Sequence, residues 1–174
     1  MWQIMIVTRI SCFLNGGVYH MIKNLSFSEL SAHSLYDILR ARFNVFVIEQ
    51  NCIYQECDDL DYLAQHLMMT DENNQLVAYA RCIIDCPDTL YPVIGRVLVV
   101  AKERGKGLGR KIIQAAISYI FSRSEATSIA ISAQAHLCTY YKKIGFRVVS
   151  TPYDDAGISH VNMLLDEDVW QKIK

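Results

Sequence analysis

Residues 97–112 read VLVVAKERGKGLGRKI and join an apolar run to a basic, glycine-rich one. The apolar run suits a strand, and apolar residues recur at helical spacing after the three alternate glycines. The first amides of a helix lack intrahelical acceptors, and the helix dipole favours negative charge there. Glycines also let a ligand approach the backbone closely. This order predicts an anion site made of Arg104, Gly105, Lys106, Gly107, Leu108, Gly109 and Arg110.

Two common phosphate-binding loops do not fit this stretch. A Walker loop needs Ser or Thr after its lysine, but Arg110, Lys111 and Ile112 follow the last glycine. A dinucleotide-binding fingerprint needs G-x-G-x-x-G at the first βα turn, whereas these glycines alternate and follow the third strand of a meander. The pattern that is left is R-G-K-G-L-G, which has the form R-x-x-G-x-G.

The patterns on both sides of the loop predict one mixed α/β domain. Residues 51–63 are acidic, lack a clear period and are expected to form a loop. A helix is expected through Leu35, Ile38, Leu39 and Phe43, and Ser34 with Asp37 resembles a capping box at its start. The other elements expected are strands at 21–27 (a short edge strand), 65–70, 75–85, 89–100, 127–135, 146–153 and 160–165, helices at 108–120 and 136–145, and a turn or short helix at 45–50.

Residues 1–20 differ in amino-acid composition from the rest of the chain. They are apolar but interrupted by Arg9, too short for a membrane span, and without the basic start or cleavage site of a signal peptide. We expect residues 1–20 to be an N-terminal extension or a misplaced start, and 21–174 to be the single domain.

Composition sets the broad class of protein. With 174 residues, 52% hydrophobic and 20% charged, and a net charge of −1, the chain should be globular, cytoplasmic and without general attraction to nucleic acid or membranes. Its six cysteines are expected to be reduced thiols, because a core of this size needs no disulfides. Their spacing predicts no metal site.

Two blocks, VLVVAKERGKGLG and AQAHLCTYYKKIGF, resemble the GCN5-related N-acetyltransferases, the GNAT superfamily. The resemblance implies a mixed, mostly antiparallel sheet of six to seven strands flanked by helices. It implies acetyl-coenzyme A (acetyl-CoA) as cosubstrate, with its pyrophosphate held by the amides of the glycine loop. It also implies that a main-chain N–H among Leu98, Val99 and Val100 polarises the thioester carbonyl.

A third block, LRARFNVFVIEQNCIYQECDDLD, together with AQAHL and YDDAGISHVNM, resembles the ElaA branch of that superfamily. The resemblance runs from about Met21 to about Leu165. The chain departs from the pattern at Cys52-Ile53-Tyr54, where proline is expected before the tyrosine, and this affects the stiffness of the loop more than its chemistry.

The resemblance gives Tyr141 the role of the acid that protonates the departing coenzyme A thiolate. The alternative is that Tyr141 only packs against the cofactor or the core, and Tyr140 is interpreted as structural. Cys138 is interpreted as a small core residue, because the reaction needs no covalent enzyme intermediate.

The acceptor side is less well specified by the sequence. Glu49 is the favoured general base, while His66, Asp154 and His160 are candidates for the acceptor pocket. The acidic residues of 51–63 could attract a cationic acceptor, or could belong to a solvated loop.

The leading hypothesis is an acetyl-CoA-dependent N-acetyltransferase that acts on a small-molecule or peptide amine. One alternative is a catalytically silent CoA-binding sensor or scaffold, which Tyr141 and the intact loop argue against. Another is a small nucleotide-binding module, which the absent Walker Ser/Thr argues against. The chain is expected to be a monomer or a homodimer, because an exposed edge strand would allow pairing.

Overall fold

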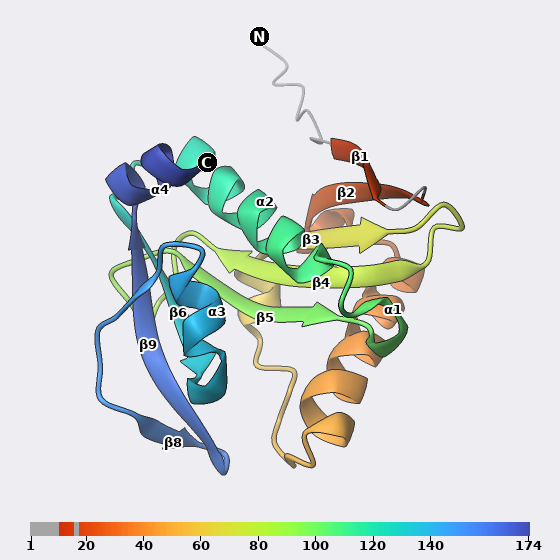
Figure 1. Ribbon diagram of the computed structural model, residues 1–174. Coiled ribbons are helices and arrows are strands. Elements are labelled where there is room, and N and C mark those ends of the chain that lie inside the picture. Colours follow the sequence, from red (N-terminus) through yellow and green to blue (C-terminus); the bar gives the residue numbers. More distant parts are fainter. Residues whose placement is uncertain (1–10, 16–17) are drawn as a thin grey trace, which may run out of the picture.

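A nine-stranded sheet forms the centre of the computed structural model, which describes residues 11–15 and 18–174 (Figure 1). The strand order is β1-β2-β3-β4-β5-β6-β9-β7, with β8 also paired to β9. Neighbouring strands are antiparallel except β5 and β6. The strands are β1 (Ser11–Asn15), β2 (Val18–Ser26), β3 (Gln65–Thr70), β4 (Leu76–Ile83), β5 (Val93–Val99), β6 (Ser128–Gln134), β7 (Arg147–Val148), β8 (Tyr153–Asp155) and β9 (Ile158–Asp166).

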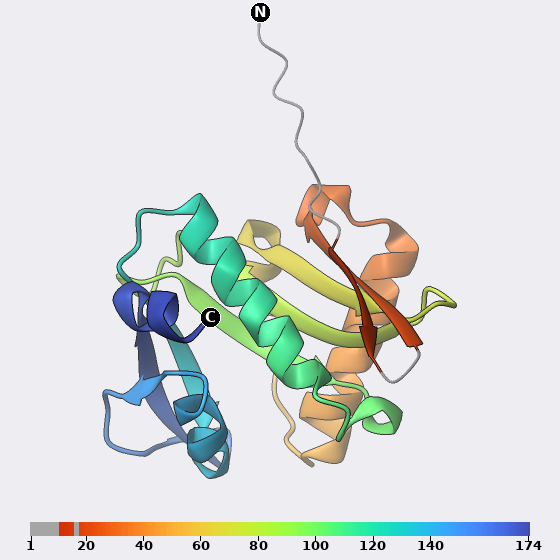
Figure 2. The ribbon, with the colours of Figure 1, turned by 45° about the horizontal axis from the view of Figure 1, so that its top comes forward.

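Helices cover both faces of this sheet (Figure 2). On one face α2 packs across β4 and β5, and on the other α1 and the π-helical segment η2 pack against the same strands. The helices are α1 (Ala32–Arg42), η2 (Phe43–Glu49), α2 (Leu108–Arg123), α3 (Cys138–Lys142) and α4 (Glu167–Ile173), with short 3-10 turns η1 (Phe27–Glu29), η3 (Leu60–Leu63), η4 (Ala101–Glu103) and η5 (Ala135–Leu137).

Helix α2 forms where its apolar spacing predicted. Its apolar stripe is buried in the larger core cluster, and the stripe consists of Leu108, Ile112, Ile113, Ala116, Ile117 and Ile120. The start of α1 was predicted wrongly, because the N-cap is Ser31 and not Ser34. The Ser31 hydroxyl accepts the Ser34 N–H at 3.1 Å, whereas Asp37 pairs with Arg40 on the helix surface.

The sheet has nine strands, two more than the upper limit of the six to seven expected. Residues 146–153 were expected to be one strand but supply the short β7 and the start of β8, and β1 adds a further strand before β2. Strand β2 is therefore not an edge strand, because β1 pairs with it on one side and β3 on the other. Whether residues 1–20 are native stays a prediction, and residues 1–10 lie outside the described part.

The sheet opens between β5 and β6. These two parallel strands share the single register pair Val93 and Ala130, beside a bond from the Ala130 N–H to the Pro92 carbonyl. Beyond that point they diverge, and Figure 1 shows β6 and β9 turned away from β1–β5. A gap of this kind leaves main-chain groups of β5 without a neighbouring strand.

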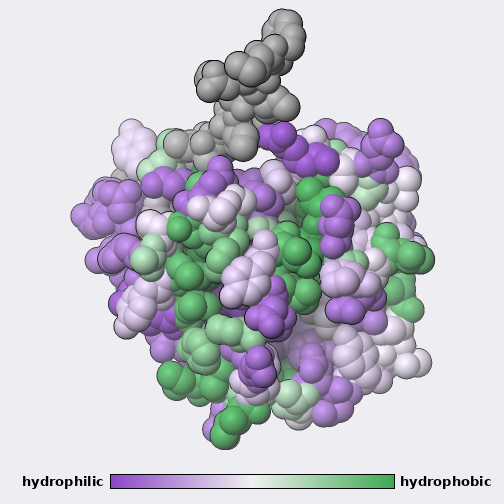
Figure 3. Space-filling model, turned by 180° about the vertical axis from the view of Figure 1, so that it is seen from behind, coloured by the Kyte–Doolittle hydropathy of each residue, from purple (hydrophilic) through white to green (hydrophobic). Residues whose placement is uncertain are grey.

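The surface over α1 and η2 mixes polar side chains with apolar ones, as Figure 3 shows from behind. Phe43 and Ile48 of η2 and Ile53 after it are among the exposed large apolar residues. In the described residues, no helix combines the length and the apolar character that crossing a membrane requires.

Gly145 closes α3 in a conformation that favours glycine. Its φ is +107°, and a Cβ there would lie 2.8 Å from Ile173 Cδ1 and 3.0 Å from Leu165 Cδ1. We expect Gly145→Ala to lower the free energy of unfolding by about 2–3 kcal/mol, measured by urea denaturation, because backbone strain and overpacking add. The control Gly157→Ala, with φ +84° and nothing within 4 Å, should cost only about 1 kcal/mol. Equal losses would show that the packing around Gly145 has no effect.

Candidate functional site

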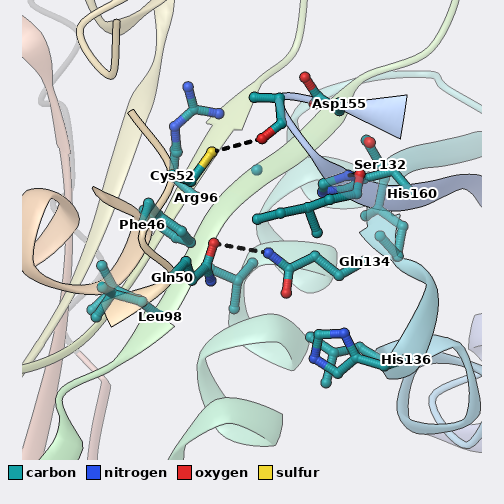
Figure 4. A pocket seen from close by; sticks show the side chains of 18 of the residues that line it. Phe46, Gln50, Cys52, Arg96, Leu98, Ser132, Gln134, His136, Asp155 and His160 are labelled. Carbon is teal, nitrogen blue, oxygen red and sulfur yellow. Dashed lines mark hydrogen bonds between the residues drawn. The ribbon is translucent and has the colours of Figure 1, made fainter. Parts of the chain in front are cut away.

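A cleft of about 660 Å³ occupies the gap between β5 and β6. One wall comes from η2, the residues after it and β5, and the other from β6, η5, Tyr141 of α3 and the β8–β9 turn (Figure 4). Two contacts cross the cleft: Gln134 Nε2 donates to Gln50 Oε1 at 3.0 Å, and the Cys52 thiol contacts the Ala156 carbonyl at 3.1 Å. The lining includes Phe46, Glu49, Tyr54, Arg96, Leu98, Val99, Arg104, Ser132, His136, Tyr141, Asp155 and His160.

The glycine loop follows directly from the β5 wall. Gly105 and Gly107 have φ of +77° and +75°, with open space where a side chain would stand. Gly107 is the N-cap of α2, so the next amides of the helix face the loop without intrahelical acceptors. Gly109 serves close packing, because a Cβ there would lie 3.2 Å from the Tyr140 hydroxyl and 3.5 Å from Val99 Cγ2.

Two cations of the loop pair with nearby acids. The Arg104 guanidinium bonds Glu49 at 2.6 Å and the Val99 carbonyl at 3.0 Å, so it links the loop to the end of η2. Lys106 pairs with Glu103 at 2.9 Å. Arg110 lies in the first turn of α2, and its positive charge opposes the rise that burial causes in the pKa of Tyr140.

Tyr141 lies at the cleft, where α3 meets β6. Its ring is 9% exposed and packs edge-on against Tyr140 and Phe146, with centroids at 5.3 and 5.8 Å. Burial raises the pKa of Tyr141 to about 12, so the phenol stays protonated at neutral pH. Tyr141 therefore keeps its phenolic proton at the cleft, and burial makes it a weaker acid than an ordinary tyrosine.

The end of β5 directs one amide into the cleft. Val100 donates its N–H to the Val77 carbonyl of β4 at 3.0 Å, so that amide is already used. Successive residues of a strand point their N–H groups to opposite sides, so Val99 points its N–H away from β4. Of Leu98, Val99 and Val100, the residues expected to supply a polarising amide, Val99 is the one whose N–H points away from β4.

A bulge in β5 lies beside this amide. The β4–β5 register shifts between Tyr79 and Arg81, and opposite the shift Arg96 has φ of 52°, in the left-handed region. Such strain persists only where the surroundings hold it. Here the Arg96 guanidinium bonds both carboxylate oxygens of Glu56 at 2.9 Å and Asp58 at 3.2 Å, and lies over the Tyr54 ring.

Glu56 and Asp58 belong to a buried cluster that sequence reasoning missed. Arg42, fully buried, bonds Glu56 and Asp61 at 2.6 Å each. Arg81 bonds Asp58 at 2.6 Å and Asp61 at 3.1 Å. Three arginines thus neutralise three carboxylates. These carboxylates neither form a solvated loop nor attract a cationic acceptor, as the sequence had suggested; only Asp59 of the four acids is exposed.

The cluster makes stability depend on pH. Burial by itself would raise the pKa values of Asp58 and Asp61, but bonds to Arg81 and Arg42 outweigh it and hold both below the ordinary range. As the pH falls, the two carboxylates are protonated in the unfolded chain before they are protonated in the folded one. Their contribution to the free energy of unfolding should therefore be complete above about pH 4 and decline below it. Urea midpoints from pH 7 to pH 2.5 should fall less steeply in Asp58→Asn than in the wild type. Parallel curves would contradict this.

The predicted acceptor residues do not all meet in the cleft. Glu49 and His160 line it, but Asp154 does not, and it accepts the Gly157 N–H at 3.1 Å in the β8–β9 turn. His66 is fully buried in β3, with its ring nitrogens 2.8 Å from the Tyr79 hydroxyl and 3.1 Å from the Asp61 carbonyl. Burial lowers the pKa of His66, so it is a neutral core residue rather than part of the pocket.

Gln50, Gln134 and His136 line the cleft although sequence reasoning did not select them. Gln50 directly follows Glu49, and Gln134 and His136 stand within the AQAHL block. That block was noticed for its resemblance and not for its side chains. Polar residues at the end of a buried strand were the signal that could have found them.

Known proteins resemble this chain over most of its length. The family model of the acetyltransferase (GNAT) domain matches residues 28–167. A UPF0039 protein of Synechocystis sp. is 42% identical over 140 residues, which are 79% of this chain and 90% of that protein. Protein ElaA of Escherichia coli is 39% identical over 144 residues, which are 81% of this chain and 93% of ElaA.

Solved structures agree with this result. The crystal structure of E. coli ElaA superposes with a TM-score of 0.77 and 35% identity, and covers 83% of this chain and 98% of ElaA. An acyl-CoA N-acyltransferase from Pseudomonas aeruginosa gives the same TM-score and identity, over 83% of this chain and 97% of the other.

Proposed function

The chain belongs to the GNAT acetyltransferase family, and from this premise we propose that it transfers an acetyl group from acetyl-CoA to an amine. The observation that carries the proposal is the glycine loop at the N-terminus of α2, which leads from the open end of β5 beside the cleft. The acyl-CoA N-acyltransferase from P. aeruginosa supports an acyl-CoA donor.

The residues of the loop fit a pyrophosphate. Two glycines in the left-handed region leave open space, and the first amides of α2 supply donors beside positive charge. Gly105 to Arg110 would hold the diphosphate, with Lys106 and Arg110 adding charge. Arg104 would position the loop, because its guanidinium is bonded to Glu49 and to Val99.

The reaction needs three groups from the protein: a donor to the oxyanion, an acid and a base. The Val99 N–H would stabilise the oxyanion that forms as the amine attacks the thioester carbonyl. Tyr141 would donate its proton to the coenzyme A thiolate as the C–S bond breaks. A base must take a proton from the amine, since alkyl ammonium groups are charged at neutral pH. No enzyme nucleophile takes part.

Tyr141→Phe is expected to lower kcat about 100-fold, because the thiolate would leave without a proton donor. The KM for acetyl-CoA should change less than threefold, because the phenyl ring keeps its packing against Tyr140 and Phe146. Release of free thiol from acetyl-CoA measures both constants. Tyr140→Phe is the matched control, and a kcat loss of the same size in both variants would reject the acid role of Tyr141.

Calorimetric titration with acetyl-CoA tests the proposal directly. Micromolar binding, followed by thiol release with an amine panel, is the expected result. Binding without thiol release for any amine would favour the CoA-binding sensor or scaffold instead. No binding by folded protein would reject the acetyltransferase function.

A further inference from the structure

His160 lies on the wall of the cleft that faces η2. In the β6–β9 register His160 stands opposite Gln134, and Asn162 opposite Ser132. Residues paired across antiparallel strands share a face, and alternate residues repeat it. Figure 4 shows His160, Ser132 and Gln134 on one wall, with Gln50 and Phe46 on the other. The imidazole therefore faces the space left for an acceptor.

One hydrogen bond fixes which ring nitrogen carries the proton. His160 Nδ1 is 2.8 Å from the main-chain carbonyl of Ile158. A carbonyl oxygen can only accept, so Nδ1 must carry the hydrogen. In the neutral ring Nε2 then has the free lone pair. Within residues 11–15 and 18–174, no hydrogen-bond partner is found for that nitrogen.

Tyr153 holds the plane of the ring. The Tyr153 and His160 rings are stacked, with centroids 6.2 Å apart and planes at 28°. The Tyr153 hydroxyl in turn lies 2.6 Å from Ser132 Oγ and donates to Asn162 Oδ1 at 2.9 Å. The imidazole is thus fixed both in tautomer and in orientation before a substrate arrives.

The other candidate bases are engaged elsewhere. The Glu49 carboxylate accepts from Arg104 at 2.6 Å, and Asp154 accepts from the Gly157 amide. His66 is buried with both ring nitrogens at partners. His136 also lines the cleft, but on the 3-10 turn η5, where its side chain is exposed and has no bond that fixes the tautomer among the described residues.

We infer that His160 Nε2 is the general base that takes the proton of the acceptor amine, an inference that rests on the proposed acyl transfer. The ammonium form of the acceptor gives one proton to Nε2, and solvent then takes that proton from the imidazolium. The neutral amine nitrogen bonds to the thioester carbon while the C–S bond breaks and Tyr141 protonates the thiolate. The nitrogen loses its second proton to solvent, and solvent returns one to the phenolate, so protons and charge balance.

His160→Asn separates the two roles of the ring. The asparagine amide can keep a donor near the position of Nδ1 for the Ile158 carbonyl, but it has no basic nitrogen. With acetyl-CoA at pH 7.5, ethylamine is a cationic probe that needs a base, and hydroxylamine is a neutral probe that does not. We expect His160→Asn to slow thiol release with ethylamine about 100-fold. With hydroxylamine the rate should change less than threefold.

His33→Asn is the matched control, because His33 is exposed on α1 and does not line the cleft. In His160→Asn, an equal loss of rate with ethylamine and hydroxylamine, or no loss of rate with either, would overturn the inference. Long-range ¹H–¹⁵N spectra of the imidazole at pH 8 decide the tautomer without any acceptor. A proton on Nδ1 is expected, and a proton on Nε2 would overturn the inference. Calorimetry with acetyl-CoA on the same variants reports separately whether the proposed function fails.

Discussion

Replacing Arg42 with alanine is expected to lower the free energy of unfolding by about 3–5 kcal/mol, because it leaves buried carboxylates without their partner. Arg42 has no exposed surface and donates to Glu56, to the Glu56 carbonyl and to Asp61. Glu56 is also fully buried, and among the described residues it would keep Arg96 and the Tyr54 hydroxyl as partners. Urea denaturation of both proteins measures the difference.

Arg40→Ala is the matched control, because Arg40 lies two residues before Arg42 in α1 and on the exposed side of the helix. Arg40 is 62% exposed and pairs with Asp37 on the surface, where such a pair contributes at most about 1 kcal/mol. Arg42→Met should lose nearly as much as Arg42→Ala, because the loss comes from the missing charge rather than from the missing volume. Similar small losses at positions 40 and 42 would show that the cluster does not stabilise the fold.

Gly107→Trp is expected to weaken acetyl-CoA binding about 1,000-fold, which corresponds to about 4 kcal/mol. Gly107 is the N-cap of α2 at φ +75°, and the open space beside it is where the diphosphate would lie. An indole there would fill that space and strain the turn. Calorimetry measures the dissociation constant, and circular dichroism shows whether the variant keeps its fold.

Gly107→Ala separates the effect of backbone strain from the effect of side-chain size. A methyl group meets nothing within 4 Å, so alanine should cost about 1 kcal/mol of stability through its left-handed φ alone, as at Gly157. Binding of acetyl-CoA by Gly107→Ala should stay within about tenfold of the wild type, a difference of about 1.4 kcal/mol. Unchanged binding in the folded tryptophan variant would show that the diphosphate binds elsewhere and that the glycine loop does not hold it.

The glycine loop and α2 could be predicted because their signals are local. Alternate glycines, neighbouring cations and apolar spacing stand within a few dozen residues, and each has a direct structural meaning. The order of strands around them was predicted from the patterns on both sides of the loop, and that order matched the family that the loop resembles. Tyr141 was selected from the resemblance, by its place four residues before Gly145, and its role stays a prediction.

The buried cluster could not be predicted, because its partners are far apart in sequence. Glu56, Asp58 and Asp61 looked solvated in a segment without a period, while their arginines come from α1, β4 and β5. No spacing rule connects positions 42, 81 and 96. The bulge at Arg96 was equally hidden, since the residue with positive φ is an arginine and the glycine stands one position earlier.

Because β1 pairs with β2, the position at which the chain starts affects how the protein associates with itself. A chain beginning at Met21 would lack β1 and the first three residues of β2. The N–H and C=O groups that now bond β1 would then face water as an open template for a second molecule. The full chain presents β1 as the edge of the sheet and the shorter chain would present β2, so the start of the chain would decide which strand can pair with a second molecule, and light scattering of the two purified forms would compare how far each self-associates.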